Sequence, residues 1–221
     1  MTIYPVAEYH TILEEKFGLP RQSGLADSLE GTITLKGEWT DPQALRGLEL
    51  FTHIWVIWGF HLNEGTPNHT VRPPRLGGNR RIGVFASRSP FRPNGLGISA
   101  LEITSINKDT AQIKVRGADL ADGTPIYDIK PYIPYSDCIP NAGEGYATNE
   151  WKELQVDLPK EAAEIFSENQ VRSLRQILAL DPRPSYQDDP EREYGLLFAS
   201  RNVKFKVKGN VLKVLSFEER S

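Results

Sequence analysis

The chain has 221 residues, a single cysteine, 39% hydrophobic residues and a net charge of −3. This composition is typical of a globular protein with one large domain or two unequal ones, and Cys138 alone excludes an internal disulfide or a multi-cysteine zinc site. The first twenty residues lack the basic and apolar regions of a signal peptide, so we expect a cytoplasmic protein. The longest apolar stretch, around Ile54–Phe60, is much shorter than the ~18 residues that span a bilayer, so no membrane association is expected.

Residues 1–143 are expected to form short strands with hardly a helix among them. The segment Leu50–Phe60 is apolar on both strand faces, which predicts a central, covered strand in which His53 is buried. Several short strands in succession favour a barrel or a sandwich over a βαβ sheet. The other expected strands are Gly31–Lys36, Ile82–Ser87, Ile98–Ile106 and Thr110–Arg116.

The small, polar and Gly-rich segment Asn141–Asn149 predicts a domain boundary, with a second, smaller α+β domain over residues 150–221. An amphipathic helix is expected over Leu158–Leu180, ended by the DPRP sequence at Asp181–Pro184. Its apolar face is expected to contain Ala163, Phe166, Leu174, Ile177 and Leu178. A terminal β-meander is expected from the strands Leu196–Ser200, Val203–Lys208 and Val211–Phe217.

Positive charge is unevenly distributed in this chain. The alternating lysines Lys204, Lys206 and Lys208 form either a solvated face or a face that meets nucleic acid. Residues 65–101 contain no Asp, Glu or Lys, and all their positive charge is guanidinium, which suits planar contacts with phosphate, carboxylate or a base. The arginines of this stretch are Arg72, Arg75, Arg80, Arg81, Arg88 and Arg92.

Common cofactor and metal motifs are missing from the sequence. There is no GxGxxG after a strand, no GxxxxGK[ST], no HExxH and no GxSxG. The four histidines show no metal-ligand spacing, so no metal site is expected.

Four segments are both polar and rich in proline or glycine, which hold loops rigid and lower the entropic cost of binding. Their strings PRQ, VRPPRLGGN, GVFASRSPFRPN and DGTPIYDIKPYIPY resemble the TsaA/TrmO family, also called YaeB-like. The DPRPSY string at Asp181–Tyr186 resembles the bacterial C-terminal extension of the family. The chain departs from the family's pattern at Gly95, where RPNPIG has proline, and at Leu62, which replaces glutamine.

The resemblance implies a single-sheet β-barrel that binds S-adenosylmethionine (AdoMet) and acts as a homodimer with the cofactor near the interface. The implied reaction is methylation of N6 of threonylcarbamoyladenosine at position 37 of tRNA (t6A37). The segments that match the family's cofactor motifs contain Pro20, Arg21, Gln22, His61, Leu62, Arg88, Asp122, Gly123, Thr124 and Pro125.

For the tRNA, the expected contacts are Arg72, Arg75, Arg80, Arg81, Arg92 and Lys130, of which Lys130 or an arginine would pair with the threonine carboxylate. Each arginine could instead form an ion pair within the fold, Arg21 could be a surface charge, and Asp122 could be only a turn residue. A general base is optional for this reaction, and Asp122, Asp128 and Tyr132 are the candidates by sequence position.

Residues 1–143 are therefore expected to form the cofactor-binding catalytic domain, and residues 150–221 to help grip tRNA. On that division, a chain cut after Glu144 would keep AdoMet binding if it folds. The alternative function is a module that binds an adenine-containing ligand or RNA without catalysis, because fold alone does not determine function. Consumption of AdoMet with t6A-containing tRNA would distinguish the two.

Overall fold

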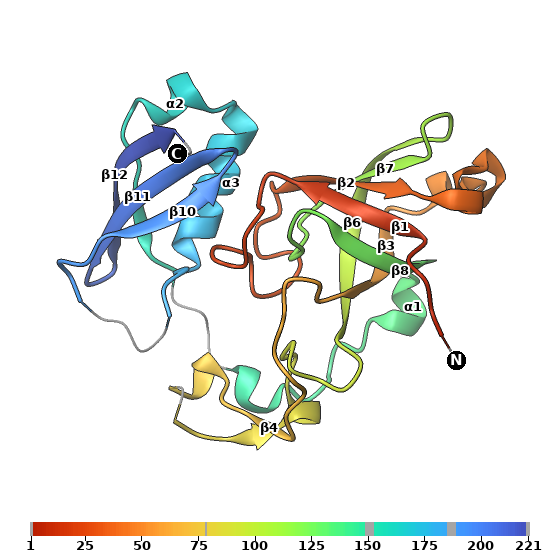
Figure 1. Ribbon diagram of the computed structural model, residues 1–221, viewed down its shortest axis with the longest axis horizontal. Helices are drawn as coiled ribbons and strands as arrows, with labels where there is room; N and C mark the ends of the chain where they lie inside the picture. Colours follow the sequence, from red (N-terminus) through yellow and green to blue (C-terminus); the bar gives the residue numbers. More distant parts are fainter. Residues whose placement is uncertain (1, 78, 149–152, 185–188, 220–221) are drawn as a thin grey trace.

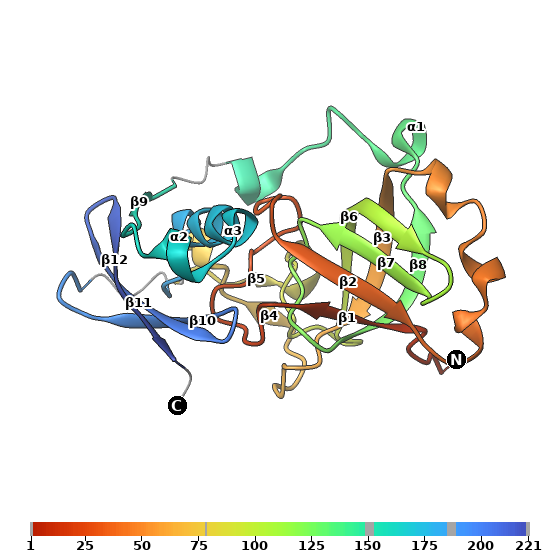
Figure 2. The ribbon, with the colours of Figure 1, turned by 90° about the horizontal axis from the view of Figure 1, so that it is seen from above.

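A computed structural model describes residues 2–77, 79–148, 153–184 and 189–219 (Figure 1). It contains a β-barrel in the N-terminal part and a smaller sheet in the C-terminal part, with helix α3 (Glu168–Ala179) lying between the two (Figures 1 and 2). In these described ranges, no helix is long and apolar enough to cross a membrane.

Six strands close into one antiparallel barrel in the order β1-β2-β7-β6-β3-β8. This confirms the predicted single-sheet barrel. The strands are β1 (Ala7–Thr11), β2 (Glu30–Leu35), β3 (His53–Gly59), β6 (Leu96–Asn107), β7 (Gln112–Arg116) and β8 (Thr124–Pro131). Closure pairs the strand edges with one another, so the barrel exposes no open edge.

The alternation of side chains along β3 shows how the barrel is filled. Ile54, Val56 and Trp58 point inward and are buried. Trp55 and Ile57 point outward and are half-buried. The prediction of a buried His53 is wrong, because this register turns His53 outward, where it is exposed beside Tyr132. The strand also begins later than expected, since residues 48–50 form a 3-10 helix.

The connection between β3 and β6 is long and contains few strand residues. Two strands of two residues each, β4 (Thr70–Val71) and β5 (Ile82–Gly83), pair antiparallel within it. The strand predicted over Ile82–Ser87 therefore ends at Gly83, because the next residues turn into the 3-10 helix η5 (Val84–Ala86), which the amide of Ser87 closes on the carbonyl of Val84.

Short helices occupy the remaining connections. They are η1 (Gly37–Thr40), η2 (Pro42–Leu45), η3 (Leu48–Leu50), η4 (Pro74–Leu76), α1 (Pro134–Asp137) and η6 (Gly145–Thr148).

The C-terminal part combines two helices with a four-stranded sheet of order β10-β11-β12-β9. The predicted meander is present, and the parallel strand β9 beside β12 was not expected. The strands are β9 (Gln155–Asp157), β10 (Tyr194–Phe198), β11 (Arg201–Lys208) and β12 (Val211–Glu219).

The single helix predicted over Leu158–Leu180 is wrong, because two helices occupy the region. Helix α2 (Ala162–Ile165) ends at Phe166, and α3 begins after Ser167, whose side chain and that of Gln170 form a reciprocal capping box. The break rotates the face of α2, so Ala162 is buried and Ala163 is exposed. Leu174, Ile177 and Leu178 are buried as predicted.

The hydrophobic core of the C-terminal part includes residues from the barrel's β1–β2 connection. Leu13, Ala26 and Leu29 pack in the same cluster as α3 and strands β10–β12. The amide of Ala199 also donates to the carbonyl of Ile12 at 3.2 Å. A chain cut after Glu144 would expose these apolar side chains, so we expect the truncation to disturb the β1–β2 connection.

Candidate active site

Three connections meet at one end of the barrel, because each strand runs antiparallel to its neighbours. They are the β1–β2 connection (12–29), the β3–β6 connection (60–95) and the β7–β8 connection (117–123). Every residue expected to bind the cofactor lies in these connections or at the start of β8. We call this end of the barrel the loop end.

Two of the expected cofactor residues, far apart in sequence, are in contact at the loop end. The Arg88 guanidinium donates a hydrogen bond from Nη1 to Oε1 of Gln22. Arg88 is exposed, and no carboxylate in the described part of the chain forms an ion pair with it. Its charge is therefore available to an anionic ligand.

His61 and the turn before β8 form a second contact at the loop end. The amide of Thr124 donates to the carbonyl of Ala121 at 3.3 Å, and Gly123 has a φ of +74°, as a type II turn requires. His61 Nδ1 lies 3.4 Å from Oγ1 of Thr124, and a Cβ on Gly123 would stand 3.8 Å from His61 Nε2. The turn backbone is thus close to the imidazole. Leu62 and Pro125 beside it are half-buried.

Asp122 joins this turn to the end of β1. Its Oδ1 accepts a hydrogen bond from the amide of Thr11 at 3.0 Å, and its own amide donates to the carbonyl of Leu13 at 2.8 Å. His10 Nδ1 lies 3.3 Å from the same carboxylate oxygen. These contacts match the alternative in which Asp122 orders the turn. The position of His10 beside the Asp122 carboxylate was not predicted from the sequence.

The other two catalytic candidates lie on the outer wall of the barrel. Asp128 pairs in register with the outward-facing Ile57, and it forms an ion pair with Lys130 at 3.0 Å. Tyr132 hydrogen-bonds through its amide to the carbonyl of His53, which begins β3 at the end opposite the loop end. Since a strand rises about 3.3 Å per residue, Tyr132 lies on the order of 25 Å along β8 from Thr124.

Tyr132 is also a poor proton acceptor in this environment. Burial raises the pKa of its phenol, and the neighbouring Cys138 and Asp137 raise it further. The phenol therefore stays protonated at neutral pH. Within this chain, the candidates Asp122 and Tyr132 lie far apart, because residues 125–131 of β8 separate Thr124 from Tyr132.

A buried polar chain beneath the loop end was not predicted. The Trp58 indole donates from Nε1 to Ser99 Oγ at 3.0 Å, and the Ser99 hydroxyl donates to Oδ1 of Asp119 at 2.5 Å. Burial raises the pKa of the Asp119 carboxyl, whereas Ser99, nearby backbone amides and the Arg88 charge lower it. Asp119 therefore links the barrel wall to the loop that contains Arg88.

The arginines of the β3–β6 connection are available to a ligand to different degrees. Arg72, Arg80 and Arg81 are exposed, and Arg81 donates to Oγ1 of Thr70 at 2.8 Å. Arg92 is half-buried and donates to the carbonyls of Ser87 and Ser89, so it supports its own loop. In the described residues, no ion pair joins these four to an acidic group, contrary to the alternative in which they pair within the fold. The side chain of Arg75 lies outside what the structure describes.

The lysine face of β11 is largely matched by glutamates. Lys204 lies 3.8 Å from Glu218, and Lys206 lies 3.5 Å from Glu193 and 3.9 Å from Glu191. This neutralisation favours the solvated surface over the nucleic-acid-facing one.

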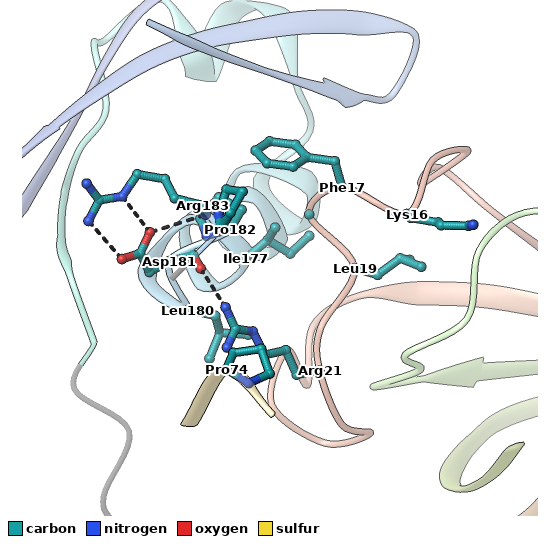
Figure 3. A pocket seen from close by; sticks show the side chains of 12 residues that line it. Lys16, Phe17, Leu19, Arg21, Pro74, Ile177, Leu180, Asp181, Pro182 and Arg183 are labelled. Carbon is teal, nitrogen blue, oxygen red and sulfur yellow. Dashed lines mark hydrogen bonds and ion pairs between the residues drawn. The ribbon is translucent and has the colours of Figure 1, made fainter. Parts of the chain in front are cut away.

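A cavity of about 520 Å³ lies between the β1–β2 connection and the C-terminal part (Figure 3). Its walls include Phe17 and Ile177, and Arg21 reaches across it to the carbonyl of Asp181 at 3.5 Å. Arg183 holds the Asp181 carboxylate through two hydrogen bonds of 2.9 Å. Arg21 thus contacts the C-terminal part, unlike its neighbour Gln22. Of the DPRPSY string, Ser185 and Tyr186 lie outside the described residues, as do Gly78 of the glycine-rich segment and Asn149 of the expected boundary.

The chemistry at the loop end fits AdoMet. The exposed Arg88 guanidinium suits the carboxylate of its amino-acid end. The backbone next to Gly123 and the half-buried Leu62 offer hydrogen-bonding and apolar surfaces for the adenine. Among the described residues, no group of three or more His, Cys, Asp or Glu could hold a metal ion.

Known proteins and family models match nearly the whole length of this chain. Residues 8–138 match the tRNA-methyltransferase O N-terminal domain, and residues 152–220 match the TrmO C-terminal domain. The chain is 39% identical to the tRNA (adenine(37)-N6)-methyltransferase of Escherichia coli K12, covering 94% of this chain and 93% of that protein. It is also 39% identical to a putative S-adenosylmethionine-dependent methyltransferase, RcsF, of Pseudomonas aeruginosa, covering 88% and 87%.

The solved structures agree with the sequence relatives. A crystal structure of TrmO from Pseudomonas aeruginosa superposes with a TM-score of 0.83 at 29% identity, covering 100% of this chain and 97% of the other. Both family models, the full-length relatives and the shared architecture lead to one assignment. The chain belongs to the tRNA-methyltransferase O family, and it is an S-adenosylmethionine-dependent methyltransferase.

Proposed function

We propose that this protein methylates N6 of t6A37 in tRNA, with AdoMet as the methyl donor. The observation that carries the proposal is the convergence of the matching segments at the loop end, where Gln22 contacts Arg88 and His61 lies against Gly123. Relatives named tRNA (adenine(37)-N6)-methyltransferase support an adenine at position 37 as the target. The expected cytoplasmic location is consistent with a tRNA substrate.

At the loop end, AdoMet supplies an electrophilic methyl group on a positively charged sulfur. The protein's part is to hold the acceptor in line with that methyl and at close range. Arg88 would hold the cofactor's carboxylate, and the turn at Gly123, with His61 beside it, would hold the adenine. Rigid turns hold these groups before the ligand arrives, which lowers the entropic cost of binding.

The acceptor nitrogen loses its proton as the new N–C bond forms. Its N–H is more acidic than that of adenine, because the carbamoyl group withdraws electron density. Of the three sequence candidates for a base, only Asp122 lies at the loop end, and its Oδ1 is already bonded to the Thr11 amide. We therefore propose Asp122 as a turn-ordering residue and assign no general base.

For tRNA, we propose that the exposed Arg72, Arg80 and Arg81 contact phosphates or unstacked bases of the anticodon loop. They lie in the same connection as Arg88, so an RNA bound to them stands next to the cofactor site. Lys130 is paired with Asp128 on the outer wall, away from these arginines, so we propose that an arginine binds the threonine carboxylate instead.

We propose a division of labour in which the barrel domain, residues 1–143, provides the cofactor site. The C-terminal domain, residues 150–221, supports the β1–β2 connection and borders the tRNA. The shared apolar cluster with Leu13, Ala26 and Leu29 supports the first role, and the cavity at Arg21 supports the second.

We propose a homodimer that forms through the outer wall of strands β3 and β6. Ile98 points outward from the middle of the wall and is 54% exposed, beside the half-buried Trp55 and Ile57. Tyr135 and Ile139, which follow β8, are also highly exposed. Exposed apolar side chains grouped on one face are typical of protein interfaces. This face adjoins the loop end through β6, which agrees with a cofactor site near the dimer interface.

The substrate is tested with purified protein and two tRNA preparations, one with t6A37 and one with unmodified A37. We expect mass spectrometry to find a methyl group added to the t6A nucleoside alone. Equal methylation of unmodified A37 would refute the t6A substrate. Methylation of neither tRNA, with AdoMet bound, would favour the non-catalytic module instead.

The tRNA surface is tested by Arg80→Ala, with Arg46→Ala as a matched control, because Arg46 is exposed at the opposite end of the barrel. We expect Arg80→Ala to weaken tRNA binding and to lower the slope of log affinity against log salt by about 0.7–0.9, the loss of one phosphate contact. AdoMet affinity, measured by calorimetry, should not change. An unchanged salt slope, or a parallel loss of AdoMet affinity, contradicts this assignment.

The dimer is tested by Ile98→Arg, with Leu215→Arg on the exposed face of β12 as the control. A buried, unpaired guanidinium in an apolar interface is costly, so we expect Ile98→Arg to sediment as a monomer and the control to remain a dimer. A dimeric Ile98→Arg protein would mean that another face forms the interface.

A further inference from the structure

We infer that Asp119 is a positioning residue of the cofactor site, which holds Arg88 and the backbone near Gln22 in place through its carboxylate. The inference rests on the proposed cofactor site at the loop end. Hydrogen bonds fix Asp119 to the barrel wall through Ser99 and Trp58, and a separate hydrogen bond joins Arg88 to Gln22 between the two connections.

The hydrogen bonds on the wall have only one possible direction. An indole N–H can only donate, so Trp58 occupies an acceptor site of the Ser99 hydroxyl at 3.0 Å. The hydroxyl must then give its proton to Oδ1 of Asp119 at 2.5 Å. Both Trp58 and Ser99 are buried on paired barrel strands. One carboxylate oxygen is therefore fixed by rigid parts of the barrel.

Groups from two connections of the site act on this carboxylate. The Arg88 charge and the backbone amide of Ser23 stabilise the ionised form of Asp119. Ser23 directly follows Gln22, and Gln22 accepts the hydrogen bond from Arg88. Asp119 thus joins the β1–β2 and β3–β6 connections to one fixed point. Among the described residues, the phenol of Tyr9 inside the barrel also senses the charge of Asp119.

A purely structural role would not require a charge at this position. An asparagine has the same shape and offers an oxygen to the Ser99 hydroxyl, without the cost of burying a negative charge. Burial raises the pKa of the Asp119 carboxyl, so the ionised form is disfavoured in the folded protein. The charge of Arg88 offsets part of this cost, and an asparagine would lose that attraction.

The test compares Asp119→Asn with Asp109→Asn, which changes an exposed carboxylate in the β6–β7 hairpin at the opposite end of the barrel. We expect calorimetry to show AdoMet binding weakened about tenfold by Asp119→Asn, as for the loss of one charge-assisted contact. The control should not change it. The melting temperature of free Asp119→Asn should equal or exceed that of the unaltered protein, because a disfavoured buried charge is gone. Binding of tRNA should stay within twofold.

A double-mutant cycle with Arg88→Gln shows whether Asp119 acts through the guanidinium. If it does, Asp119→Asn should change AdoMet affinity less than twofold in the Arg88→Gln background. Full additivity of the two changes, or unchanged AdoMet binding by a folded Asp119→Asn, would overturn the inference. A structural role predicts instead that Asp119→Asn lowers the melting temperature and weakens AdoMet and tRNA binding equally. That result would also overturn the inference. Failure of the unaltered protein to bind AdoMet would refute the proposed function instead.

Discussion

Closure of an all-antiparallel barrel is the constraint on which the rest of this structure depends. Once β1 pairs with both β2 and β8, each connection must leave from one end or the other, and the β1–β2, β3–β6 and β7–β8 connections leave from the same end. Residues separated by dozens of positions, such as Gln22 and Arg88, meet because of this topology. No Rossmann-type helix N-terminus is required, which agrees with the missing dinucleotide motif.

The second constraint is the way the C-terminal part holds the β1–β2 connection. Helix α3 contacts the β1–β2 connection through polar groups as well as through packing. Gln176 Oε1 accepts a hydrogen bond from the amide of Ser28 at 3.1 Å, and Arg172 lies 3.2 Å from Asp27. Gly18 lets the connection approach the C-terminal sheet, because a Cβ there would stand 2.2 Å from Leu196. The connection that contains Gln22 is thus ordered from both sides, by the barrel and by α3.

Sequence reasoning predicted the barrel and the segments of the site, because strand periodicity and long exact motifs are local signals. It did not predict where the chain leaves a regular element. The strand expected over Ile82–Ser87 stops at Gly83 in a turn, and the helix over Leu158–Leu180 breaks at a capping box that favours a new start at Ser167. It also could not choose between Asp122 and Tyr132 as a base, since closeness in sequence does not show that an extended strand separates the two residues.

Asp119 is the clearest example of a site residue that sequence reasoning did not find. Its hydrogen-bond partner Ser99 lies 20 positions earlier, on the strand β6 that pairs with β7, and Arg88, whose charge stabilises its ionised form, lies 31 positions earlier. One local signal was present, because Asp119 is a lone carboxylate between the buried Ala118 and Leu120. A charge in an apolar setting is costly unless it is bonded, and such a residue is a candidate for function even without a motif.

The central claim is that the cofactor binds where the three connections meet. Hydrogen–deuterium exchange of the purified protein with and without AdoMet tests it most directly. AdoMet should slow amide exchange in residues 20–23, 87–92 and 117–124, and it should leave residues 36–52 and 108–111, at the opposite end, unchanged. Protection confined to that opposite end or to the C-terminal sheet, with no change in the three connections, would contradict the account.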